Sequence, residues 1–262
     1  MYSIKNFLLK RKLNIICTVC SIITLCLVWV IAYYSVGNDY IIPSFTDTLI
    51  SLGQCLADGV YWLALLNTLV RTLIAFAVSF ALATVLAALS AISKAFCAFV
   101  KPVMVFLRTL PTLAVILILL VWTNPKIAPV IVTVLILFPM IYAQLAAAIG
   151  GIDSGLVEMA EVYGLSKRDR LFKIYLPLVS PNILSQTGAN ASFAIKLMVS
   201  AEVLANTFNS LGGLMQNAKL YAEMPRLAAL TLVAVVLGLI IDGCFSLLER
   251  VTFKWSVKEG GN

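Results

Sequence analysis

The chain has 262 residues, of which 61% are apolar and 12% are charged, against about 45–50% and about 25% in soluble proteins. This balance indicates a membrane protein. Six spans of about 20 residues each use about 120 residues, and the rest divides among connectors and tails, so no soluble catalytic domain fits. Histidine is absent, which excludes Ser-His-Asp triads, Cys-His dyads and histidine metal sites.

Six cysteines are present, and one C-x-x-C spacing joins Cys17 and Cys20. That pair lies inside an apolar run, where free cysteine behaves as a small hydrophobic residue. We therefore expect neither a metal site nor a cofactor in this chain.

Apolar runs predict an all-α polytopic membrane protein with six transmembrane helices, forming one transmembrane domain over residues 1–262. The runs cover about 13–36, 63–92, 103–122, 127–149, 181–204 and 227–248. The first run is too long for a signal-peptide core of about 7–15 residues and indicates an uncleaved span. Residues 44–59 carry apolar side chains at helical spacing, which predicts an amphipathic helix at the outer surface. A break from Arg108 to Pro111 lies within the third run.

Basic residues are distributed unevenly between the two sides of these spans. With the amino terminus inside, only Lys126, Lys219 and Arg226 fall outside, while Arg71, Arg108 and Lys196 lie within spans. The cytoplasmic ones are Lys5, Lys10, Arg11, Lys12, Lys94, Lys101, Lys167, Arg168, Arg170, Lys173, Arg250, Lys254 and Lys258. By the positive-inside rule, both termini are expected in the cytoplasm.

The longest charged stretch, about residues 151–177, predicts a bent pair of short helices on the cytoplasmic face. Leu156 to Tyr163 forms the first helix, and Gly164 ends it because glycine tolerates the left-handed conformation. Ser166, followed by Asp169, is typical of a capped start for a second helix, from Lys167 to about Leu176. Pro177 then begins a new element. We call residues 151–177 the coupling loop.

The coupling loop resembles the EAA signature of permease subunits of bacterial ATP-binding cassette importers. That signature reads E-A-A, three residues, G, nine residues, I, one residue, L-P. The matching residues are Glu158, Ala160, Gly164, Ile174, Leu176 and Pro177, while Met159 replaces the middle alanine.

Other segments are similar to the nitrate, sulfonate, taurine and bicarbonate branch of this family. They are Leu107 to Pro111, Ala201-Glu202, Leu211 to Gly213, Asp242, and Glu249-Arg250 through Trp255.

The resemblance therefore implies a permease subunit that works as a homodimer in the bacterial inner membrane. It implies three kinds of partner: ATPase subunits docked on the coupling loop, an external solute-binding protein, and membrane lipid. It also implies a small organic or inorganic anion as the solute, and it gives no role to nucleic acid. The chain has no Walker A motif, so ATP must be bound by the partner ATPase.

Lys196 and Glu202 are candidates for the substrate path, because ionisable groups within a span are costly and often functional. Six residues apart on one helix, they point about 120° away from each other and are not expected to pair directly. Path lining and structural pairing remain open for Lys196, and we expect Glu202 to be solvated near the outer end. The small residues Gly188, Ala189, Ala191 and Ala194 predict close helix packing.

Two alternatives to a permease are weighed. A secondary transporter or channel has the same composition, but the EAA-like loop argues against it. An integral membrane enzyme is disfavoured because histidine and clustered carboxylates are lacking. We therefore expect a permease without enzymatic activity of its own.

Overall fold

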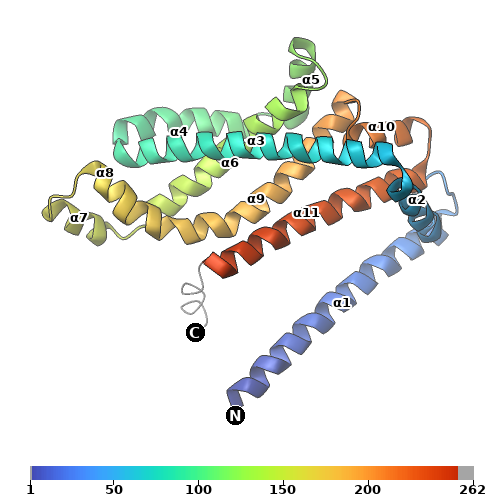
Figure 1. Cartoon of the computed structure of the whole chain (residues 1–262), viewed down its shortest axis with the longest axis horizontal. Helices are drawn as coiled ribbons and strands as arrows, with labels where there is room; N and C mark the ends of the chain where they lie inside the picture. Colours follow the sequence, from blue (N-terminus) through green and yellow to red (C-terminus); the bar gives the residue numbers. More distant parts are fainter. Residues whose placement is uncertain (1, 253–262) are drawn as a thin grey trace. The chain divides into compact units, whose positions relative to one another are not determined.

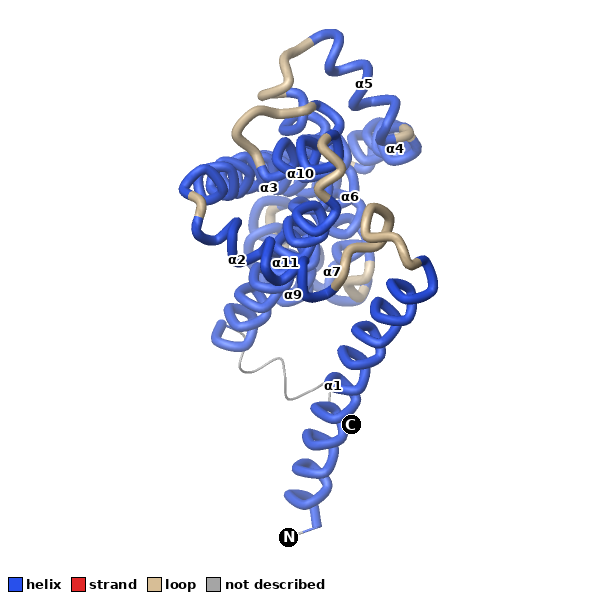
Figure 2. The backbone as a smooth tube through the Cα atoms, turned by 90° about the vertical axis from the view of Figure 1, so that its right-hand side faces the viewer, coloured by secondary structure: helices blue, strands red, loops and turns tan. Residues whose placement is uncertain are grey.

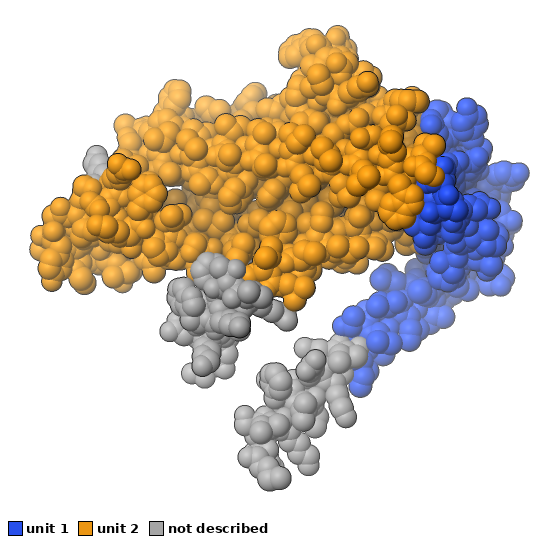
Figure 3. Space-filling view, viewed as in Figure 1, with its two compact units in different colours: residues 1–58, 217–230 blue, residues 59–216, 231–262 orange. Residues whose placement is uncertain are grey.

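The computed structural model describes residues 2–252, and these residues form helices and connectors without a strand (Figure 2). This confirms the all-α class. The expected carboxy-terminal segment through Trp255 extends beyond the described residues, as do the charges at Lys254 and Lys258. The chain divides into two compact units, which are described separately (Figure 3).

Unit 1 comprises residues 1–58 and 217–230 and contains α1 (Tyr2–Val36) and α2 (Phe45–Ala57). Residues 16–36 of α1 are long and apolar enough to cross a membrane. The Trp29 indole donates a hydrogen bond to the Pro43 carbonyl at 3.1 Å. Ser44 caps α2 by accepting a hydrogen bond from the Asp47 amide at 3.0 Å, so the helix expected within residues 44–59 is present.

Unit 2 comprises residues 59–216 and 231–262, and its core is formed by three packed helices. These are α3 (Gly59–Ile92), α6 (Ala128–Gly150) and α9 (Leu176–Ala205), labelled in Figure 1. The buried face of α3 carries mainly small side chains, namely Ala64, Thr68, Thr72, Ala75, Ser79, Ala83 and Ala87. Small residues at helical spacing allow the backbones of neighbouring helices to approach closely.

The third apolar run is a broken helix pair, not a straight span. Helix α4 (Lys94–Thr109) and α5 (Thr112–Trp122) meet at a bend of 92°. Leu110 and Pro111, which separate them, have extended backbone conformations. Proline lacks an amide hydrogen and disfavours helical conformation in the residue before it. The break predicted within Arg108 to Pro111 is therefore confirmed. The helix itself begins at Lys94, before the apolar run that the sequence places from about residue 103.

Within residues 2–252, four helices are long and apolar enough to cross a membrane, and the bent pair raises the number to five at most. The four segments are Ile16–Val36, Gly59–Ile92, Ala128–Gly150 and Met224–Leu248, the last within α11 (Met224–Thr252). Helix α9 does not meet this criterion, since it carries polar residues such as Gln186, Asn190 and Lys196. The expected number of six spans is therefore not confirmed.

Helix α9 also begins differently from the expectation. The helix α8 (Lys167–Arg170), the π-helical segment η1 (Leu171–Tyr175) and α9 follow one another without a connector. At their junction, the Leu176 amide donates to the Leu171 carbonyl, five residues back. Because Pro177 has no amide hydrogen to donate, a π turn at this point keeps the chain helical. Pro177 lies in the first turn of α9, so the new element predicted at this proline is present, although it follows η1 without a connector.

Candidate functional site

The first half of the coupling loop ends in a glycine cap. Helix α7 (Ser154–Val162) is followed by Gly164, which has a φ of 70°. The Leu165 amide reaches back over this glycine and donates to the Ala160 carbonyl at 3.0 Å. This is the bond of a Schellman-type helix end, in which glycine avoids the strain of the left-handed conformation. The predicted cap at Gly164 is confirmed.

The second half of the loop starts at a capped helix. The Ser166 hydroxyl accepts a hydrogen bond from the Asp169 amide at 3.1 Å and donates to the Asp169 carboxylate at 2.5 Å. Lys173 forms an ion pair with the same carboxylate at 2.7 Å. The Lys173 ammonium, followed by the Ser166 hydroxyl, lowers the pKa of Asp169 below its ordinary value. The predicted capped start is therefore present.

The six residues that match the EAA signature differ in exposure. Ala160 is buried and Ile174 is partly buried, while Glu158, Gly164, Leu176 and Pro177 are exposed. Beside them, Met159, Val162 and Tyr163 on and after α7 are 55%, 86% and 78% exposed. Large apolar side chains gathered on a charged loop are typical of an interaction surface. We call Met159, Val162 and Tyr163 the apolar face of the coupling loop.

A buried ion pair joins α3 to the carboxyl end of α9. The Arg71 guanidinium lies 3.0 Å from Glu202 Oε1, and the Glu202 side chain is fully buried. Glu202 Oε2 accepts hydrogen bonds from the Thr68 hydroxyl at 2.8 Å and from the Gly212 amide at 3.3 Å. The expectation that Glu202 is solvated is wrong, because all of these groups enclose it. Glu202 is instead paired with Arg71.

The segment that follows α9 packs directly on this ion pair. The Leu211 amide, at the start of α10 (Leu211–Leu220), donates to the Thr68 hydroxyl at 2.9 Å. A Cβ atom on Gly212 would collide with the Glu202 side chain, and one on Gly213 would collide with the Thr207 carbonyl. The two glycines are therefore required for close approach and do not form a plain connecting loop.

Lys196 lies apart from this ion pair. Its side chain is exposed in the isolated chain, whereas Glu202 is enclosed, in agreement with their predicted divergence around the helix. Gly188 marks a close approach of α9 to α11, because a Cβ atom there would lie 2.9 Å from the Phe245 Cβ. The Ser192 hydroxyl donates to the Gly238 carbonyl at 2.7 Å nearby. The prediction that small residues on this helix allow close packing is confirmed at Gly188.

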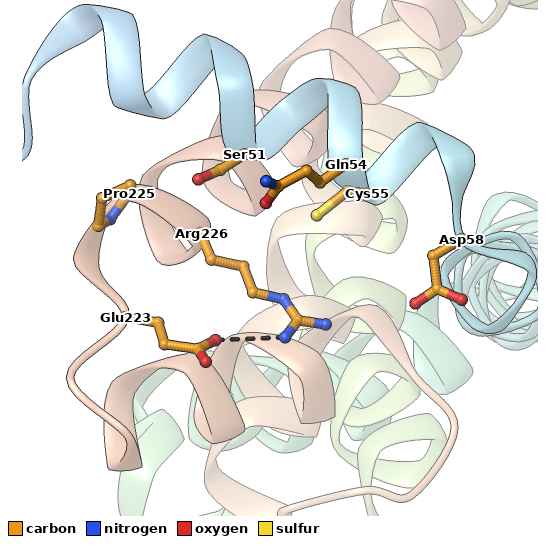
Figure 4. A pocket seen from close by; sticks show the side chains of 7 residues that line it. All are labelled: Ser51, Gln54, Cys55, Asp58, Glu223, Pro225 and Arg226. Carbon is orange, nitrogen blue, oxygen red and sulfur yellow. Dashed lines mark hydrogen bonds and ion pairs between the residues drawn. The ribbon is translucent and has the colours of Figure 1, made fainter.

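Unit 1 contains a polar pocket of about 450 Å³ (Figure 4). Arg226 forms an ion pair with Glu223 at 3.2 Å within it, and Asp58 also lines it. Cys55 is 6% exposed, and burial raises the pKa of its thiol. Because two carboxylates and one guanidinium share the pocket, it does not favour an anion.

Sequence reasoning missed two buried polar clusters in unit 2. One is the hydrogen-bond network of Thr68 around Glu202. The other is a reciprocal pair of amides, Gln144 and Asn190, which joins α6 to α9. Both amides are polar residues within otherwise apolar stretches, and that pattern is the sequence feature that points to them.

Comparison with known proteins places the chain among transport components. Residues 79–254 match the family described as the binding-protein-dependent transport system inner membrane component. An aliphatic sulfonates transport permease protein of Bacillus subtilis, SsuC, is 24% identical over 230 residues, covering 87% of this chain and 83% of that protein. Its Escherichia coli namesake is 32% identical over 155 residues, or 57% of each chain.

A solved structure shows a similar fold. The crystal structure of an amino acid ABC transporter with histidines superposes with a TM-score of 0.61 at 20% identity, covering 71% of this chain and 91% of that one. This likeness extends to the fold alone, whereas the family match covers more than half of the sequence. The chain belongs to the family of inner membrane components of binding-protein-dependent transport systems.

Proposed function

We propose that this chain imports a small organic anion, with sulfonates as the leading class, by alternating access. An external binding protein delivers the solute, and a separate ATPase that binds ATP drives the transport. The chain contributes one transmembrane domain and needs no cofactor of its own. The named sulfonate permeases among its relatives support this solute class.

The coupling loop is the observation that carries this proposal. Its two capped helices, α7 and α8, form a bent structure whose angle depends on Gly164. The apolar face of the coupling loop is exposed in the isolated chain, and an ATPase subunit is the partner proposed to cover it. Glu158, Ala160, Gly164, Ile174, Leu176 and Pro177 then form the coupling segment.

The translocation path is proposed to lie between two copies of the chain. Lys196 is exposed on α9. If it faces a water-filled path, the free-energy cost of burying its ammonium in the membrane is avoided. Glu202 has a different proposed role, since Thr68, Arg71 and Gly212 enclose it. It fixes the end of α9 and does not contact the solute.

Membrane orientation is proposed to place the coupling loop and both termini in the cytoplasm. Cys55 is a poor probe of the outer side because it is buried and its thiol pKa is raised. Cysteines introduced at Phe208 and Tyr163, which are 76% and 78% exposed, serve better. In intact cells an impermeant thiol reagent should label Phe208→Cys and should label Tyr163→Cys only after permeabilisation. The opposite pattern overturns the orientation.

Site-specific cross-linking tests the docking of the ATPase. A photo-reactive amino acid is placed at Tyr163, on the apolar face of the coupling loop, or at Phe208 as a matched aromatic control. The ATPase expressed with the chain should cross-link from Tyr163 and not from Phe208. Failure of the ATPase to co-purify, or equal cross-linking from both positions, contradicts the proposed function. A channel or secondary transporter would show no ATPase at either position.

A further inference from the structure

Helix α2 in unit 1 carries apolar and polar side chains on two different sides. The apolar stripe consists of side chains at helical spacing, namely Phe45, Leu49, Leu52 and Leu56. The polar stripe has the same spacing and consists of Asp47, Ser51 and Gln54. Because each residue turns a helix by about 100°, the two stripes lie on nearly opposite sides. Such a helix lies along a membrane surface, with its apolar side toward the bilayer and its polar side toward water.

The apolar stripe begins next to the end of the first span. The ring centroid of Phe45 lies 6.0 Å from that of Trp29, with the two rings edge to face. Trp29 belongs to the segment Ile16–Val36, which is apolar enough to cross a membrane, and tryptophan is enriched at the membrane–water interface. The polar stripe therefore points away from the bilayer, into the outer aqueous space in the proposed orientation.

The pocket of about 450 Å³ in unit 1 lies beside the polar stripe. Ser51 and Gln54 line it from α2, and Asp58 lines it from the position after this helix. Figure 4 shows Glu223 and Arg226 across the pocket from α2. Asp58 is exposed, and the side chains of Glu223 and Arg226 are 46% and 42% exposed. A soluble partner therefore has access to the charged groups of the pocket.

The charges that line the pocket favour a cationic group. Two carboxylates, Asp58 and Glu223, face one guanidinium, that of Arg226, which leaves one net negative charge. Asp47, on the polar stripe, adds a further carboxylate to this surface. Arg226 already lies 3.2 Å from Glu223, so the pocket accommodates a guanidinium. Exposed ion pairs are weak, and Glu223 is therefore able to pair with a cation of a partner as well.

A protein suits this surface better than a free small cation does. Tyr221, two residues before Glu223, is 77% exposed, and exposed aromatic residues are enriched in protein interfaces. Acidic groups that meet a basic patch of a partner also guide its approach and fix its register. The combination of a charged pocket, a polar stripe and an exposed tyrosine is that of a docking surface for a basic protein surface.

We propose that this pocket receives a lysine or arginine side chain of the external solute-binding protein, and that Asp58 and Glu223 hold its cationic group. This role rests on the proposed function, which supplies both the binding protein and the outer location of α2. Helix α2 lies outside residues 79–254, which match the family, so the family match assigns no role to this pocket.

Site-specific cross-linking tests where the binding protein docks. The chain is assembled with its ATPase in lipid nanodiscs, and the solute-binding protein encoded with it is added. A photo-reactive amino acid is placed at Gln54, which is exposed on the polar stripe, or at Leu49, which is 47% exposed on the apolar stripe. The binding protein should cross-link from Gln54 and not from Leu49.

Affinity measurements on the same complex test the charges. Asp58→Asn combined with Glu223→Gln should weaken binding of the solute-binding protein about tenfold at low ionic strength and reduce its salt dependence. Asp39→Asn provides the matched control, because Asp39 is an exposed carboxylate of unit 1 that does not line the pocket. This control should bind almost as tightly as the unmodified complex, and both variants should melt at its temperature.

Three results would overturn the proposed docking site: unchanged affinity in the double variant, an equal loss in Asp39→Asn, or cross-links from Gln54 to lipid or to a second copy of the chain. A failure of the binding protein to associate with the unmodified complex contradicts the proposed function instead. The two failures are distinguishable, because the first three results all require a binding protein that still docks.

Discussion

Removal of Glu202 is expected to destabilise the protein far more than removal of an exposed carboxylate. Glu202→Ala deletes an acceptor of three hydrogen bonds, from Thr68, Arg71 and Gly212. The Arg71 side chain is only 18% exposed, so its charge would lose its partner in a mostly enclosed site. Breaking a buried ion pair in this way costs about 3–5 kcal/mol.

The matched control is Glu223→Ala. Glu223 also pairs with an arginine, Arg226, at 3.2 Å, but both side chains are more than 40% exposed. Exposed pairs contribute about 0–1 kcal/mol. Thermal melting of the purified variants in one detergent should therefore show a large decrease for Glu202→Ala and almost none for Glu223→Ala.

A double variant separates the two contributions to this effect. Arg71→Met combined with Glu202→Met removes both charges and should recover part of the stability lost in Glu202→Ala, since no unpaired ion remains. Equal melting temperatures for Glu202→Ala, Glu223→Ala and the unmodified chain would refute the reasoning. The contribution of an ion pair to stability would then not depend on its burial.

Gly164→Val should strain the left-handed residue by about 1–2 kcal/mol, and transport-coupled ATP hydrolysis should fall while the protein still inserts; unchanged coupling would contradict this. Gly188→Leu should force α9 from α11 and cost about 1–3 kcal/mol, whereas Gly243→Leu, which meets no neighbouring atom within 4 Å, should melt normally. The pKa of Asp169 is lowered by Lys173, so its stabilisation is present above about pH 3.9 and is lost as the pH falls through the lowered value. Amide exchange of the coupling loop should show this loss in the unmodified chain and not in Asp169→Asn.

Local features of the fold were predictable from sequence because they depend on neighbouring residues. The cap at Gly164, the capped start at Ser166 and the break at Pro111 each follow from the conformational limits of one or two residues. At Pro177 the new helix α9 begins as predicted, but the π turn that joins it to the preceding helix without a connector was not predictable.

Contacts between distant residues were beyond sequence reasoning. Arg71 and Glu202 are 131 positions apart, and no periodicity in the sequence shows which charges on separate helices meet. The pair of Gln144 and Asn190 is similar, since it depends on the packing of α6 against α9. Such contacts determine whether a polar residue in a span is enclosed or faces a cavity.

Solute uptake into proteoliposomes tests the central claim most directly. The vesicles contain this chain with its ATPase, and radiolabelled alkanesulfonates are presented together with the binding protein. The account predicts uptake that requires ATP, the ATPase and the binding protein together. Uptake at the same rate without ATP, following the solute gradient, would contradict it and would favour a channel or secondary transporter.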